Sequence, residues 1–135
     1  MPQQFNLKLN KTRLKSFNFR VNEEHNNNDE IQLNFGISNA YHYEYKEKKI
    51  YCLVSVSINQ EDCPFFLDID YEGVFEVDRR VSKKRIEPFG KINCPAILFP
   101  FLRECIADIT RRADLEPLLL PAINFVELAK QKSQE

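Results

Sequence analysis

The sequence predicts an α+β fold, in which an antiparallel sheet is followed by a long helix and a short one. Apolar residues alternate at period two over residues 3–77, and over residues 90–132 they either recur at helical spacing or form an apolar loop. Short polar turns separate the alternating segments, and such turns favour antiparallel pairing of consecutive strands. With 135 residues, of which 43% are hydrophobic, the chain can bury one compact core. Residues 1–135 are therefore expected to form a single domain.

The sheet is expected to contain four strands, and in each of them the alternation places the apolar side chains on one face. The first strand is predicted to be interrupted near Lys11. The Asn-rich stretch at residues 22–29 is predicted to be a solvated loop. The four strands are expected at residues 5–19, 31–45, 50–58 and 65–77.

The segment CPAILFPFLRECI, residues 94–106, is almost wholly apolar and is predicted to begin the long helix. Asn93 is expected to cap this helix, and Pro95 falls in the first turn, where a missing N–H is tolerated. Pro100 is expected to kink the helix or to mark its true start. A broad apolar stripe recurs at helical spacing: Ile97, Leu98, Phe101, Leu102, Cys105, Ile106 and Ile109.

Three leucines between two prolines follow the long helix in the segment DLEPLLLPA, residues 114–122. The prolines predict an apolar loop in place of a continuous helix. Because loops are normally polar, this one is expected either to pack across its own sheet or to form a hydrophobic binding surface. The sequence leaves both alternatives open. Asn124 is expected to cap a last short helix.

The charge balance and the hydropathy pattern exclude several classes of function. The 19 basic and 20 acidic residues give a formal net charge of -1, which provides no general attraction for nucleic acid. The longest apolar run, Pro95 to Leu102, is shorter than the roughly 20 residues that a membrane span needs. The N-terminus lacks the charged, apolar and small-residue zones of a signal peptide. A cytoplasmic protein without membrane insertion is therefore expected.

The residues that carry out catalysis or bind metals do not form a recognisable set. The four cysteines, Cys52, Cys63, Cys94 and Cys105, form no CxxC pair, which favours free thiols packed as small hydrophobic residues. Two histidines and three glycines provide neither a nucleophile arrangement nor a phosphate-binding loop. We expect no enzymatic activity, no cofactor and no metal site.

Three carboxylates, Asp68, Asp70 and Glu72, lie on one face of the predicted fourth strand. A solvated strand face is the simplest explanation, and an acidic docking patch is the more specific one. A metal site is the least favoured, because side chains two apart on a strand do not converge.

The run CPAILFPFLRECIADITRRA, followed by an apolar loop with prolines and by INFVEL, resembles the bacterial SecB family of protein-export chaperones. FLDIDYEGVFEV is similar to the last strand of that family, and EIQLNFGIS and QFNLKLNKTRLKSFNF fit its earlier strands more loosely. The likeness is strongest over about residues 90–130. It implies a four-stranded antiparallel sheet, a long helix, a crossover loop and a short helix, assembled into a homotetramer that is a dimer of dimers.

The resemblance also implies a function. Members of the family are ATP-independent holdases that bind unfolded polypeptides, such as preproteins for Sec-dependent export, in hydrophobic grooves. Some SecB-like proteins are instead dedicated to an antitoxin of a toxin–antitoxin system, and this alternative stays open. The tail KQKSQE differs from the acidic, sometimes metal-binding extension with which many members contact SecA. The acidic strand face is the other family contact with SecA.

Three sets of residues are assigned by this resemblance. The client groove is expected to be lined by Leu33, Phe35, Leu115, Leu118, Leu120, Phe125 and Leu128. Docking of a partner such as SecA is expected at Phe66, Asp68 and Asp70. The oligomer interface is expected to contain Leu98, Leu102, Cys105, Ile106 and Ile109.

Overall fold

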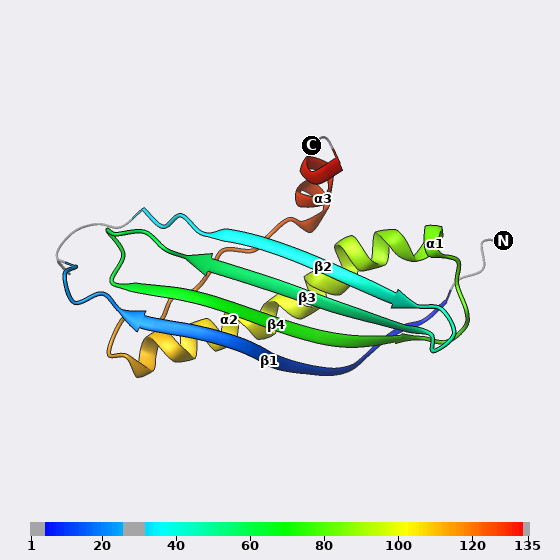
Figure 1. Cartoon of the computed structure of the whole chain (residues 1–135), viewed down its shortest axis with the longest axis horizontal. Coiled ribbons are helices and arrows are strands. Elements are labelled where there is room, and N and C mark those ends of the chain that lie inside the picture. Colours follow the sequence, from blue (N-terminus) through cyan, green and yellow to red (C-terminus); the bar gives the residue numbers. More distant parts are fainter. Residues whose placement is uncertain (1–4, 26–31, 134–135) are drawn as a thin grey trace.

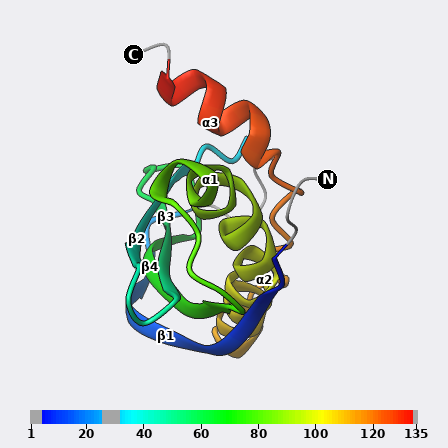
Figure 2. The same ribbon diagram turned by 90° about the vertical axis from the view of Figure 1, so that its right-hand side faces the viewer.

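The computed structural model describes residues 5–25 and 32–133, and it confirms the predicted α+β fold. The four strands form one antiparallel sheet in the order β1-β4-β3-β2. Helices α1 and α2, joined by a π-helical turn η1, cover one face of this sheet, and α3 lies beyond its edge (Figures 1 and 2). The elements are β1 (Leu7–Val21), β2 (Gly36–Glu44), β3 (Lys49–Ile58), β4 (Phe65–Val77), α1 (Lys83–Pro88), η1 (Phe89–Asn93), α2 (Cys94–Arg112) and α3 (Phe125–Ser133).

The fourth strand matches its predicted position, whereas the first strand begins and ends two residues later than predicted. The predicted fourth strand is β4, with the expected bounds. The predicted interruption near Lys11 corresponds to a shift in the pairing of β1 with β4 between Leu9 and Lys11. A second shift lies between Leu14 and Ser16. The strand itself continues through both irregularities, as strands with β-bulges do.

The second strand is shorter than predicted, because β2 begins at Gly36. Leu33 and Phe35 therefore precede the strand, and the predicted start at Ile31 lies outside the described residues. The pairing of β2 with β3 ends at Gly36 and Ser57, so residues 32–35 pair with none of the described strands. The side chain of Gln60 bonds to it instead: Gln60 Oε1 accepts from the N–H of Asn34 at 2.6 Å, and Gln60 Nε2 donates to the carbonyl of Gln32 at 3.0 Å.

The core lies between the helical layer and the inner face of the sheet. Residues four apart along α2 face the sheet and are fully buried: Cys94, Leu98, Leu102, Ile106 and Thr110. Opposite them, a Cβ atom added to Gly73 of β4 would lie 3.0 Å from Cδ1 of Leu98. A Cβ atom at position 73 would therefore require the side chain of Leu98 to shift by a few tenths of an ångström, so α2 packs closely over this glycine.

The helical segment begins earlier than predicted. Ser82 caps α1, and its Oγ accepts from the N–H of Arg85 at 3.4 Å. Asn93, the predicted cap, has helical dihedral angles (φ -70°, ψ -46°) and makes no side-chain cap bond. Asn93 is therefore an interior residue of a longer helical segment. Pro100 lies inside α2 and does not mark its start.

The π-helical turn η1 crosses β2 at very short range. A Cβ atom added to Gly90 would lie 2.4 to 2.6 Å from ring atoms of Tyr41. Real side chains do not tolerate such distances, so glycine is required here by close packing. At Gly36 an added Cβ would meet nothing within 4 Å.

A Gly90→Ala substitution is expected to lower the free energy of unfolding by about 1–3 kcal/mol, the usual range for overpacking a tight contact. Gly36→Ala is the matched control and is expected to change stability by less than about 0.5 kcal/mol. Denaturant unfolding of both variants tests this packing. Equal losses of stability in the two variants would contradict it.

Candidate functional site

The crossover loop starts at a tight turn that ends α2. Asp114 has a positive φ of 61°, a conformation that aspartate tolerates better than most residues. The N–H of Asp114 donates to the carbonyl of Arg111 at 3.1 Å, and the N–H of Leu115 donates to the carbonyl of Thr110 at 3.1 Å. These two bonds form a Schellman motif, which reverses the chain at the helix end.

The leucine segment then continues without regular structure through residues 115–124. Pro117 and Pro121 lack the N–H groups that a helix would need. The N–H of Leu118 donates to Oγ1 of Thr110 at 2.9 Å. The loop is thus tied by its backbone to the last turn of α2, and its leucine side chains are free to make apolar contacts.

A groove of about 550 Å³ lies beside this loop and brings together three of the predicted client-binding residues: Leu33, Leu115 and Leu118. We call it the loop groove. Its apolar lining comes from the loop, from the segment before β2 and from the start of β4. The other lining residues are His25, Cys63, Pro64, Phe65, Asp114, Glu116 and Pro117.

Two predicted groove residues belong to the core instead. Leu120 and Phe125 are buried in the described chain, with 2% and 4% of their surfaces exposed. The ring of Phe125 meets Phe99 of α2 edge to face, at a centroid distance of 5.8 Å. These side chains attach the loop and α3 to the body, and they are not open to a ligand.

The other two predicted groove residues, Phe35 and Leu128, lie outside the loop groove. Both are half-buried and pack against the core. Leu119, which was not predicted, is 75% exposed. The run of three leucines alone does not indicate that its middle member points outward while the next one is buried.

The predicted oligomer interface also needs correction. Leu98, Leu102 and Ile106 are fully buried against the subunit's own sheet, so they are core residues. The outward side of α2 carries Ile97 and Phe101 instead, which are 42% and 38% exposed. Cys105 and Ile109 are half-buried. A second cavity, of about 460 Å³, lies on this side of α2: its lining includes Tyr71, Phe101, Cys105 and Pro117.

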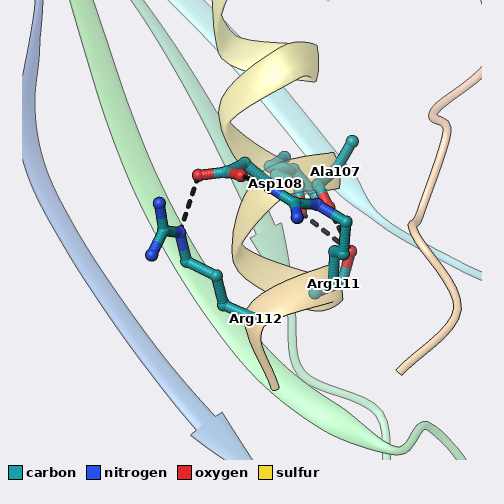
Figure 3. A network of polar contacts seen from close by, with 6 residues as sticks. Ala107, Asp108, Arg111 and Arg112 are labelled. Atoms are coloured by element: carbon teal, nitrogen blue, oxygen red, sulfur yellow. Dashed lines mark hydrogen bonds and ion pairs between the residues drawn. The ribbon is translucent and has the colours of Figure 1, made fainter. Parts of the chain in front are cut away.

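Charged side chains surround the end of α2. Asp108 lies between Arg111 and Arg112 (Figure 3), and Arg112 Nε donates to Asp108 Oδ2 at 3.0 Å. Hydrogen bonds from Arg112 and then from Arg111 lower the pKa of Asp108. Both arginines also lie at the end of the helix where positive charge is favourable. This charged end borders the 460 Å³ cavity through Asp108 and Arg111.

The predicted docking residues lie on the sheet face away from the helices. Asp68 accepts from Oγ of Ser57 at 2.6 Å, and Asp70 accepts from Oγ of Ser55 at 2.6 Å. The guanidinium of Arg20 lies 4.5 Å from the centre of the Phe66 ring. The two carboxylates are therefore held in place by neutral hydroxyls on β3, and no bound cation is needed to order them.

The thiols are in environments that suit packing. The four cysteines are free, and Cys52, Cys63 and Cys94 are buried. Burial raises the pKa of Cys52 to about 12 and also raises the pKa of Cys94. Reactive cysteines need the opposite shift, because the thiolate is the nucleophile.

No group of three or more His, Cys, Asp or Glu side chains is placed to hold a metal ion within residues 5–25 and 32–133. None of the helices in those ranges has the length and apolar character to cross a membrane. The loop groove is the candidate site that the geometry favours.

Comparisons with known proteins identify the family of this chain. The family model for preprotein translocase subunit SecB matches residues 3–135. The protein-export protein SecB of Roseobacter denitrificans is 35% identical over 78% of this chain and 67% of that protein. An uncharacterized protein of Methanocaldococcus jannaschii is 30% identical over 99% of this chain and 93% of its own length.

The matches to seven bacterial protein-export proteins cover between 43% and 67% of the length of those relatives. Among solved structures, a SecB-like chaperone of Mycobacterium tuberculosis in complex with an antitoxin peptide superposes with a TM-score of 0.74. It shares 15% sequence identity and covers 87% of this chain and 90% of its own. A structure at this identity shows the common fold. The family match over nearly the whole sequence shows that the chain belongs to the SecB family.

Proposed function

We propose that this protein is an ATP-independent holdase chaperone, which binds unfolded polypeptides in the loop groove and has no enzymatic activity. The observation that carries the proposal is the groove itself: about 550 Å³, with Leu33, Leu115 and Leu118 in its lining. The protein-export relatives in the same family support export preproteins as the clients. The chaperone would bind these preproteins in the cytoplasm, before they are exported.

The mechanism needs no nucleotide. Unfolded chains expose apolar side chains, and their burial is favourable by roughly 25 cal/mol per Å² for any apolar sequence. A protein that binds the unfolded chain preferentially removes it from the folding equilibrium by mass action. The groove lining also contains polar side chains: His25, Asp114 and Glu116. Polar groups of a bound client could therefore stay in contact with charged side chains or with water.

Assembly would increase the binding strength. In a homotetramer arranged as a dimer of dimers, several loop grooves would bind one long client, and each bound segment would raise the effective concentration of the next. The outward side of α2, with Ile97 and Phe101, is a suitable surface for a second copy, because large apolar side chains are exposed there.

The acidic sheet face would then serve a separate purpose. Phe66, Asp68 and Asp70 lie away from the helical layer, so a partner could approach them while a client occupies the loop groove. A basic patch on a partner ATPase such as SecA is complementary to these carboxylates, which would steer its association at low salt.

A second candidate function is that of a chaperone dedicated to one antitoxin. The structural neighbour from Mycobacterium tuberculosis is a SecB-like chaperone bound to an antitoxin peptide, and this observation favours the alternative. Promiscuity distinguishes the two functions: a general holdase suppresses the aggregation of several unrelated unfolded proteins, whereas a dedicated chaperone protects one.

The loop groove can be tested by changing Leu115 and Leu118 together to serine. Removing these two side chains is expected to weaken the binding of a reduced, unfolded client by about 2–3 kcal/mol of apolar contact. This corresponds to a rise in Kd of roughly 30- to 150-fold. Calorimetry with the client, beside a melting curve for each variant, measures both binding and stability.

Tyr45→Ser is the matched control, because Tyr45 is exposed at the β2–β3 turn, at the other end of the sheet from the loop groove (Figure 1). It should bind the client as the wild type does. A folded double-serine variant with unchanged affinity would place the client elsewhere on the molecule.

The assembly can be tested on the outward side of α2. Ile97→Lys combined with Phe101→Lys should lower the mass in light scattering from about four times 16.0 kDa to that of smaller species, because unpaired charges would enter the interface. The exposed positions let each subunit stay folded, whereas Ile106→Asp would place a charge in the core. Tyr45→Lys provides the control. An unchanged tetramer in the double-lysine variant, or a monomeric wild type, would refute this interface.

A further inference from the structure

Thr110 interrupts the apolar stripe of α2 at the point where the crossover loop begins. Buried residues recur every four positions along the helix, and Thr110 occupies the place where a fifth apolar side chain would continue the series. It is completely inaccessible to solvent. A buried hydroxyl is unfavourable unless its hydrogen bonds are satisfied, so its partners require explanation.

The hydroxyl of Thr110 is bonded on both sides. It accepts a hydrogen bond from the backbone N–H of Leu118 at 2.9 Å. Its own proton can reach the carbonyl oxygen of Ile106 at 2.9 Å or that of Ala107 at 3.0 Å. Because a hydroxyl carries one proton, accepting from Leu118 directs that proton toward the helix carbonyls.

The backbone of the same residue holds a second point of the loop. The carbonyl of Thr110 accepts from the N–H of Leu115 at 3.1 Å. The two leucines bonded to Thr110 are therefore the two loop leucines that line the loop groove. The segment between them, Glu116 and Pro117, is closed into a short turn across the end of α2.

We propose that Thr110 is a positioning residue for client binding: its hydroxyl holds the crossover loop so that Leu115 and Leu118 line the loop groove. This inference rests on the proposed holdase function and deepens it. Without the hydroxyl, the loop would spend part of its time away from the position that forms the groove. The apparent affinity for a client falls by the fraction of molecules in the competent state.

Thr110→Val tests the proposal, because valine keeps the branched shape and removes the hydroxyl. The apparent Kd for a reduced, unfolded client is expected to rise about tenfold, and the amide of Leu118 is expected to exchange its hydrogen about tenfold faster in the free protein. Amides in the middle of β3, such as that of Val54, should keep their wild-type exchange rates. Thr110→Ser is the matched control: it retains the hydroxyl and should restore both values to nearly those of the wild type.

The outcomes separate the two levels of the hypothesis. If exchange at Leu118 is unchanged in Thr110→Val, the hydroxyl does not hold the loop and the inference is overturned. If exchange rises but client affinity stays the same or increases, the hydroxyl holds the loop without positioning the groove, which also overturns it. If the wild-type protein binds no unfolded client while the exchange results are as expected, the proposed holdase function fails and the structural role of the hydroxyl stands.

Discussion

The contact between one side of α2 and the inner face of the sheet holds the other parts of the molecule in place. Leu98 packs directly over Gly73, and Leu102 and Ile106 follow it into the same layer without any exposure to solvent. Each fully buried side chain of this kind stabilises the fold by roughly 1.5–3 kcal/mol. Because α2 is fixed along its length, both of its ends are fixed as well: η1 lies against Tyr41 of β2, and Thr110 lies at the start of the crossover loop.

This contact also divides the surface of the subunit into regions with different properties. With one side of α2 turned inward, Ile97 and Phe101 point outward, where a second copy could cover them. The loop groove lies at the C-terminal end of the helix, beside Leu115. The opposite sheet face carries hydrogen-bonded carboxylates such as Asp70. In the proposed function, assembly, client binding and partner docking use separate surfaces.

Periodicity in the sequence predicts the elements more reliably than it predicts their exposure. Strict alternation gave the bounds of β4, and Asn124 caps α3 as expected, since its Oδ1 accepts from two backbone N–H groups. The apolar stripe of α2 is broad, and periodicity alone does not tell which members face the sheet of the same subunit. The resemblance places Leu98 and Ile106 in an interface, and periodicity cannot show that they are core residues. The loop residues follow no period, so the burial of Leu120 depends on tertiary packing that a local pattern does not contain.

The central claim is that unfolded clients bind at the loop groove, and site-specific crosslinking tests it most directly. Glu116 is exposed and belongs to the groove lining, so a photoreactive phenylalanine analogue there should leave the fold intact. The same analogue at Tyr45, at the far end of the sheet, is the control. If clients bind at the loop groove, a reduced, unfolded client should crosslink efficiently from position 116 and little from position 45. Equal crosslinking from both positions, or crosslinking from position 45 alone, would contradict it.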